Sequence, residues 1–327
     1  MENTNWQKGA EFLNVQYPIL CGAMSWVSEH NLVSAISNAG GFGIIACGAL
    51  SPEMLSVEIK KTQNQTSRSF GVNLITMHPQ ITELIDVCIT ENVKYVVLAG
   101  GLPKSSQIQQ LKDSGIKVLC FTPTLKLAQR LVQLGVDALV IEGMEAGGHI
   151  GPVSTSVLVQ EILPNIKEVP VFIAGGIGRG EMIANYIKMG ASGCQLGTRF
   201  VCATESIAHP KFKEAFIKAN ARDAVPSVQL DEDFPVIPVR ALANNATKKF
   251  MDVQRKAIVD YKEGKLSKKD AQLQIEHFWA GALKKAVIDG DIENGSVMAG
   301  QSVAFIKKEQ PAAEIIEELV VQTKNSL

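Results

Sequence analysis

Short apolar runs recur along the chain up to about residue 200. Eight of them, rich in Val, Ile and Leu, lie at residues 18–21, 43–46, 70–74, 95–99, 117–121, 138–141, 171–174 and 193–196. Stretches with helical patterning separate the runs, for example residues 29–39, 52–61, 125–134 and 180–189. Several of these stretches end on a glycine suited to a helix C-cap, namely Gly40, Gly115, Gly135 and Gly190. The pattern predicts eight successive strand–helix units.

The apolar runs are nearly continuous and do not alternate strictly with polar residues. Strands of this kind are typical of a parallel sheet that is covered on both faces. Eight units in about 200 residues predict an α/β fold of the TIM (β/α)8 barrel type, with an open doubly wound sheet as the alternative. The dinucleotide fingerprint G-x-G-x-x-G is missing after the first run, where Cys21, Gly22, Ala23 and Met24 stand instead. Its absence favours the barrel.

The composition and hydrophobic pattern of the sequence change after the eighth run. From about residue 205 to residue 294 the chain is charged and has helical patterning, and residues 295–327 regain an apolar helical pattern. We therefore expect a barrel in residues 1–205 and an inserted small α-helical domain in residues 206–294. Residues 295–327 are expected to return and pack on the barrel.

Composition and charge exclude several classes of function. The 327 residues include 32 basic and 33 acidic ones, so the net charge is −1, and nucleic acids and anionic membranes are not expected partners. No apolar run approaches the roughly 18 residues of a membrane span, and the first residues lack a signal-peptide pattern, which predicts a cytoplasmic protein. The six cysteines form no C-x-x-C and the five histidines lack ligand spacing, so buried, reduced thiols and no metal site are expected.

Glycine-rich turns follow the seventh and eighth runs. In a TIM barrel the active site lies at the carboxyl ends of the strands, and the turns after strands seven and eight often bind phosphate through backbone N–H groups. Gly175 and Gly176 follow the seventh run, and Gly197 and Thr198 follow the eighth. The two turns together predict a phosphate site, whereas the simpler interpretation is that the glycines only permit tight turns.

Polar side chains at other strand ends complete the predicted site. His149 lies after the sixth run in a loop with four glycines and two carboxylates nearby, and we expect it to contact substrate or cofactor as acid, base or hydrogen-bond donor. The simpler alternative is an ordinary surface histidine, and His78, just past the third run, is the second candidate. Asn73, Gln195 and Thr198 can hydrogen-bond a flat heterocycle or a phosphate. Cys21 and Cys194 are expected only to pack.

Seven segments together resemble one family over nearly the whole chain: residues 18–27 (PILCGAMSWV), 38–45 (NAGGFGII), 70–74 (FGVNL), 137–151 (DALVIEGMEAGGHIG), 174–180 (AGGIGRG), 195–201 (QLGTRFV) and 205–210 (ESIAHP). The sequence resembles the nitronate monooxygenase/FabK family of FMN-dependent TIM-barrel flavoproteins. This resemblance implies that FMN binds at the barrel mouth and that His149 is the catalytic histidine. The implied cofactor-binding residues are Gly22, Ala23, Met24, Asn73, Glu142, Gly147, Gly148, Ala174, Gly175, Gly176, Gln195, Gly197 and Thr198.

The resemblance implies an oxidoreductase and leaves its substrate open. A FabK-type enoyl-acyl-carrier-protein reductase uses NADH or NADPH and an enoyl thioester, a nitronate monooxygenase uses an alkyl nitronate and O2, and a third group reduces quinones. Residues 142–151, 240–244 and 295–301 look closer to the reductase branch, whereas residues 21–24 and 98–103 depart from it. We expect the reductase, with an acyl thioester or acyl carrier protein as partner. The sequence is compatible with a homodimer, and a non-enzymatic flavin-binding barrel is the alternative of another class.

Overall fold

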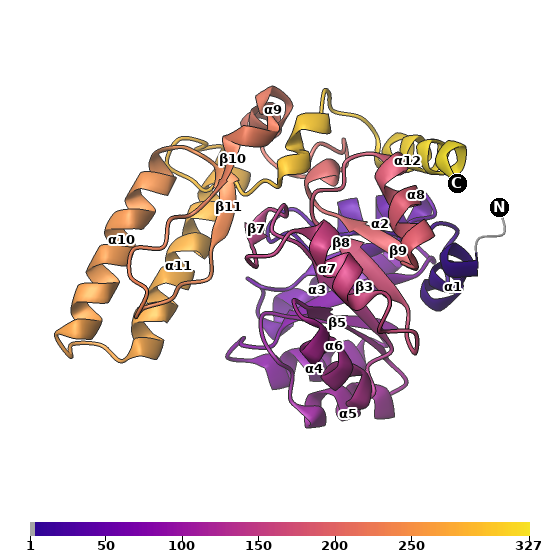
Figure 1. Cartoon of the computed structure of the whole chain (residues 1–327), viewed down its shortest axis with the longest axis horizontal. Coiled ribbons are helices and arrows are strands. Elements are labelled where there is room, and N and C mark those ends of the chain that lie inside the picture. Colours follow the sequence, from indigo (N-terminus) through magenta and orange to yellow (C-terminus); the bar gives the residue numbers. More distant parts are fainter. Residues whose placement is uncertain (1–3) are drawn as a thin grey trace.

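A computed structural model describes residues 4–327 and contains a closed parallel β-barrel (Figure 1). The eight strands are paired in the order β1-β9-β8-β6-β5-β4-β3-β2. Backbone hydrogen bonds of 2.9 Å from Cys21 to Phe42 and from Phe42 to Ile19 join the first and last strands of this order and close the barrel. The TIM-barrel prediction is confirmed. The barrel strands are β1 (Ile19–Cys21), β2 (Gly43–Ala46), β3 (Phe70–Ile75), β4 (Tyr95–Ala99), β5 (Lys117–Thr122), β6 (Ala138–Glu142), β8 (Val171–Ala174) and β9 (Gly193–Leu196).

Helices cover the outside of the barrel, and one of them returns from the far end of the sequence. The helix α12 packs beside α8 and α2 and so completes the ring (Figure 1). The long segment between β9 and α12 is therefore an insertion in the eighth strand–helix unit. The surrounding helices are α2 (His30–Asn38), α3 (Pro52–Gln65), α4 (Ile81–Thr90), α5 (Ser105–Asp113), α6 (Leu125–Gln133), α7 (Thr155–Ile162), α8 (Gly180–Met189) and α12 (Ala312–Ser326).

The amino end of the barrel is closed by the helix α1 (Thr4–Leu13). Leu13 is fully buried among inward-facing side chains of the strands, and the Phe12 ring lies edge-on to Tyr95 at 6.1 Å between ring centroids. The Tyr95 hydroxyl donates to the backbone oxygen of Phe12 at 3.0 Å, which satisfies its polar group at the rim of the apolar interior. The lower part of the barrel is thus a packed core, and the site must lie at the opposite end.

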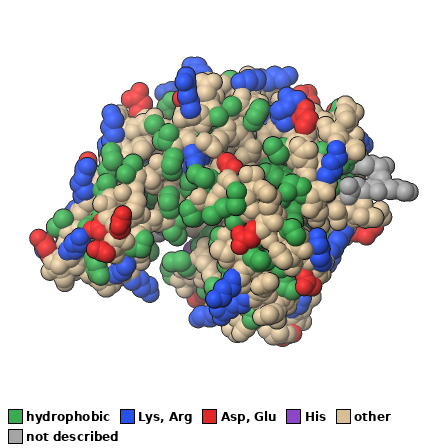
Figure 2. Space-filling view, in the orientation of Figure 1, with side chains coloured by type: hydrophobic (Ala, Val, Ile, Leu, Met, Phe, Trp, Pro, Cys, Tyr) green, Lys and Arg blue, Asp and Glu red, His purple; other side chains and the backbone are tan. Residues whose placement is uncertain are grey.

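The inserted segment contains a second hydrophobic core. Phe234, Phe250, Ile275 and Trp279 pack together there, apart from the main core cluster. Its long helices α10 (Asn245–Lys262) and α11 (Lys268–Val287) project from the barrel as a pair (Figure 1). The helix α9 (Pro210–Lys218) instead contributes its aromatic side chains to the main core. Figure 2 shows a recess between the projecting pair and the barrel.

The insertion also contains strands that helical patterning did not predict. The short strands β10 (Ala224–Pro226) and β11 (Val239–Leu242) form an antiparallel sheet with β7 (Gly148–His149). Three short 3-10 turns complete the elements: η1 (Thr198–Phe200), η2 (Ala221–Asp223) and η3 (Gln301–Phe305). Among the helices in residues 4–327, none is long and apolar enough to cross a bilayer.

Candidate active site

The floor of the barrel mouth is made of small and polar side chains. Inward-facing positions alternate along each strand, and lower positions such as Phe172 and Val140 belong to the packed interior. Two residues further along, the same faces carry Ala174 and Glu142, which are register partners on β8 and β6. Gln195, the register partner of Ala174, extends this row on β9. The other inward positions near this level are Gly22, Ala46, Asn73, Ala99 and, on β5, the larger Phe121, so most of the side chains that line the floor are small.

Two amides on this floor offer hydrogen bonds to a ligand. Gln195 is 6% exposed, and its Oε1 atom is buried without a hydrogen-bond donor among the described residues. Asn73 donates through Nδ2 to the Val97 backbone oxygen at 3.0 Å, which orients its Oδ1 atom. A Cβ atom at Gly22 would lie 3.5 Å from Nε2 of Gln195. Because a buried, unpartnered amide oxygen is costly, Gln195 is the clearest sign of a bound N–H or O–H group here.

The turn after β8 has the conformation of an anion-binding loop. Gly175 and Gly176 both have positive φ, +94° and +72°, which L-residues rarely adopt. Among the described residues, no turn or loop hydrogen bond is donated by the backbone N–H of Gly176 or Gly197. Successive N–H groups in such a turn converge on one point and attract an anion. A Cβ at Gly176 would lie 3.0 Å from the Glu145 Cβ, so a larger side chain would crowd the turn.

The neighbouring turn after β9 is hydrogen-bonded to the segment that returns to the barrel before α12. The Thr198 hydroxyl oxygen accepts a hydrogen bond of 2.9 Å from the Gly300 backbone, so its own hydrogen remains available to a ligand. A Cβ at Gly197 would lie 3.4 Å from the sulfur of Met24, which places the loop after β1 next to this turn. Ala23 and Met24 are partly buried on the same side of the mouth.

His149 lies on the exposed edge of the loop that follows β6. It belongs to β7 and is the register partner of Val239 on β11. Glu142 lies at the start of the loop, where burial raises the pKa of its carboxyl to about 7 and the charge of His149 opposes that rise. The structure thus brings an imidazole and a carboxyl that titrates near neutrality to one side of the predicted floor.

The sequence did not reveal what holds this loop. The Glu145 carboxylate accepts hydrogen bonds of 2.9 Å from the Thr155 backbone N–H and hydroxyl and thereby caps α7, and its backbone oxygen accepts from Gln301. Gly147 and Gly148 continue the loop, and a Cβ at Gly147 would lie 2.6 Å from the Gly300 nitrogen. The glycines and the two carboxylates in the segment were the available signals, but their partners come from distant parts of the chain.

The remaining titratable candidates serve packing and capping. Burial raises the pKa of the Cys21 thiol to about 12 and also raises that of Cys194, so neither is a ready nucleophile. All six cysteines are buried and free, as expected. His78 lies in the loop after β3, where its Nδ1 accepts from the Gln80 backbone.

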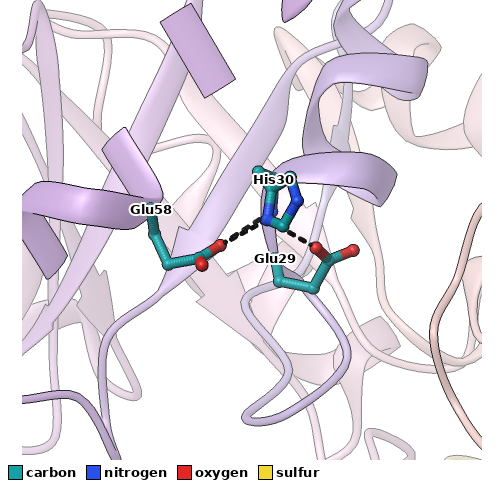
Figure 3. Close-up of side chains that lie close together, drawn as sticks. All are labelled: Glu29, His30 and Glu58. Carbon is teal, nitrogen blue, oxygen red and sulfur yellow. Dashed lines mark hydrogen bonds and ion pairs between the residues drawn. The ribbon is translucent and has the colours of Figure 1, made fainter. Parts of the chain in front are cut away.

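Among the described side chains, one group has the chemistry of metal ligands (Figure 3). Nδ1 of His30 lies 2.8 Å from carboxylate oxygens of Glu29 and of Glu58. Both carboxylates have structural partners: Glu29 caps α2 by accepting from the Asn31 and Leu32 backbones, and Glu58 on α3 accepts from the His30 backbone. The group therefore ties α2 to α3.

Known proteins with similar sequence and structure place this site in context. The model of the nitronate monooxygenase family matches residues 7–87 and 79–322. The structure of FabK from Thermotoga maritima superposes with a TM-score of 0.86 and 36% identity, covering 97% of this chain and 96% of that one.

Two other relatives differ in coverage. A (3aS,4S,5R,7aS)-5-hydroxy-7a-methyl-1-oxo-octahydro-1H-indene-4-carboxyl-CoA dehydrogenase from Rhodococcus jostii is 29% identical over 95% of this chain and 93% of its own length. A probable nitronate monooxygenase from Staphylococcus aureus is 30% identical over 67% of this chain and 75% of its own. Members of this family are generally flavin-dependent, and the family match shows that this chain is an oxidoreductase. The chain belongs to the nitronate monooxygenase family.

Proposed function

We propose that this protein is an FMN-dependent reductase that carries a hydride from NADH or NADPH to the β-carbon of an enoyl thioester. The observation that carries the proposal is the similarity to FabK at 36% identity over 97% of the chain, a higher identity than either the Rhodococcus or the Staphylococcus relative has. The Rhodococcus relative, named for a carboxyl-CoA substrate, also aligns over nearly the whole chain. The Staphylococcus nitronate monooxygenase aligns over 67% of it.

The residues at the barrel mouth fit FMN. The phosphate would be held by the backbone N–H groups of Gly176 and Gly197, with the Thr198 hydroxyl beside them. The ring would lie over the small floor residues, where the unpartnered Gln195 oxygen would accept a hydrogen bond from a ring N–H and Asn73 would offer its amide oxygen.

The chain itself binds, orients and supplies protons. FMN, when bound, supplies the relay of a hydride between the nicotinamide and the substrate. His149 stands at the exposed side of the site and donates a hydrogen bond or proton to the thioester as negative charge develops on it. The Glu142 carboxyl, with its pKa near 7, is largely protonated below that pH and acts as a second hydrogen-bond donor. Residues 206–294 would cover the substrate and exclude water.

A nitronate monooxygenase is the second candidate, favoured by the description of the family model and by the Staphylococcus relative. In that reaction His149 would act as a base or would orient the nitronate, and O2 would complete the turnover. Quinone reduction is the third candidate. All three use the same flavin site, so they differ in which molecule reduces the flavin and which one oxidises it.

Anaerobic flavin spectroscopy distinguishes these candidates. Purified protein loaded with FMN is mixed separately with NADH, NADPH or an alkyl nitronate, and loss of the oxidised flavin absorbance is followed. The proposal expects fast bleaching by a reduced nicotinamide and recovery on adding a crotonyl thioester, whose coenzyme A and acyl carrier protein forms are compared. Recovery with a quinone alone would redirect the assignment to quinone reduction. Bleaching by nitronate with inert nicotinamides would overturn the reductase assignment, and failure to bind FMN would overturn the flavin site.

A further inference from the structure

The loop that carries His149 is held in place by hydrogen bonds to the inserted segment. Residues 143–152 leave the barrel after β6, and a hydrogen bond of 2.8 Å from Met144 to Val153 closes the base of the loop. Its outer edge pairs with β11, and the Ile150 backbone adds a 2.9 Å hydrogen bond to Pro238. The position of the His149 backbone therefore depends on a strand about 90 residues away in sequence, in a separate part of the fold.

Arg240 is the polar side chain at the centre of this junction. It lies on β11 as the register partner of Gly148, the residue before His149, and it is 2% exposed. Its Nε donates to the Met144 backbone oxygen at 3.0 Å, and its Nη1 donates to the Ala224 backbone oxygen at 2.5 Å. One guanidinium thus joins the base of the loop to β10 and β11.

We propose that Arg240 is a positioning residue for His149, through which the inserted segment sets the place of the imidazole over the site. The inference rests on the proposed function in that His149 acts on the substrate. Arg240 acts through the loop, because the hydrogen bonds of its Nε and Nη1 both go to backbone oxygens of the junction. A displacement of about 1 Å in a catalytic group can lower a rate by about 100-fold, so the loss of this support has a measurable cost.

The chemistry of arginine explains why this residue type occupies the position. The planar guanidinium presents N–H groups in several fixed directions and reaches two carbonyl oxygens from different segments at once. A lysine ammonium keeps the charge but cannot reproduce this fixed, forked arrangement of N–H donors. Arg240→Lys is therefore expected to rescue folding better than it rescues turnover, and Arg240→Met removes both the fork and the charge.

A double-mutant cycle tests whether Arg240 acts through His149. Turnover of Arg240→Met per bound flavin is expected to fall about 10- to 100-fold, with FMN content unchanged because the Gly175 turn is not touched. In the His149→Ala background the same change is expected to cost less than about two-fold, because the group that it positions is gone. Equal losses in both backgrounds would overturn the proposal. Arg255→Met, an exposed arginine on α10 paired with Asp252, is the matched control.

Hydrogen exchange gives a readout that does not depend on activity. In Arg240→Met, amide exchange across residues 143–152 is expected to rise at least 10-fold, while the barrel strands and α10 keep their wild-type rates. Unchanged amide exchange in the loop would overturn the proposal. Exchange that rises as much throughout α10 and α11 as in the loop would also overturn it, because this result indicates a purely structural role. If Arg240→Met does not fold, Arg240→Lys is used for both measurements. A protein that shows the exchange effect but no thioester reduction would refute the proposed function and leave the positioning intact.

Discussion

Glu142 offers a direct test of the electrostatics of the site. Burial at the end of β6 raises the pKa of its carboxyl from 4.5 to about 7. The folded state then binds this proton more tightly than the unfolded chain does, so the folded state carries more protons between these two pH values. Stability therefore falls as pH rises through this window. At about 1.4 kcal/mol for each pKa unit, the total loss is about 3 kcal/mol, present in full above pH 7.

Replacing this carboxyl with an amide removes the penalty. In the flavin-free protein, the free energy of unfolding of Glu142→Gln is expected to exceed that of wild type by an amount that grows as the pH rises from about 4.5 to about 8. The excess reaches about 3 kcal/mol, and most of the increase falls between about pH 5 and pH 7. Urea unfolding of both proteins across this range measures the difference. Glu161→Gln, an exposed carboxylate on α7, controls for the loss of one acidic group. A difference between Glu142→Gln and wild type that changes by less than about 0.5 kcal/mol from pH 5 to pH 8 would refute the assignment of a buried, protonated carboxyl.

Three further changes test the other parts of the site and fold. His149→Ala should keep FMN and lose about 10²- to 10⁴-fold in turnover under steady-state assay, and near wild-type turnover would contradict its role. Gly176→Val should release FMN, measured as the flavin-to-protein ratio, with an unchanged circular dichroism spectrum, because its φ is +72° and a Cβ would lie 3.0 Å from that of Glu145; stoichiometric flavin would contradict the phosphate turn. Trp279→Ala should destabilise the inserted segment by about 3–5 kcal/mol in chemical unfolding, because its ring lies 4.3 Å from that of Phe250 in the second core. If Trp279→Ala unfolds in a single transition at the wild-type denaturant concentration, the second core contributes little to stability.

The sequence by itself determined the barrel and the edge where its chemistry lies. Apolar runs that match buried strands, and glycines such as Gly190 at the end of α8 with φ of +115°, are local signals, because burial and backbone conformation act on a residue and its near neighbours. Polar residues at strand ends could be assigned to one mouth since all strands of a TIM barrel run in the same direction. In this way Asn73 and Gln195, from strands far apart in sequence, were predicted to share one site.

The tertiary structure alone decided how that site is held. The two-residue strand β7 has no periodicity to detect, and its pairing with β11 depends on where the insertion folds. Arg240 looks like one charged residue among many until its partners, Met144 and Ala224, are seen to be backbone oxygens brought together by folding. The same holds for Glu145, whose carboxylate caps α7. Sequence patterns report which side chains are buried, but the choice of hydrogen-bond partner depends on contacts between distant segments that form only when the chain closes on itself.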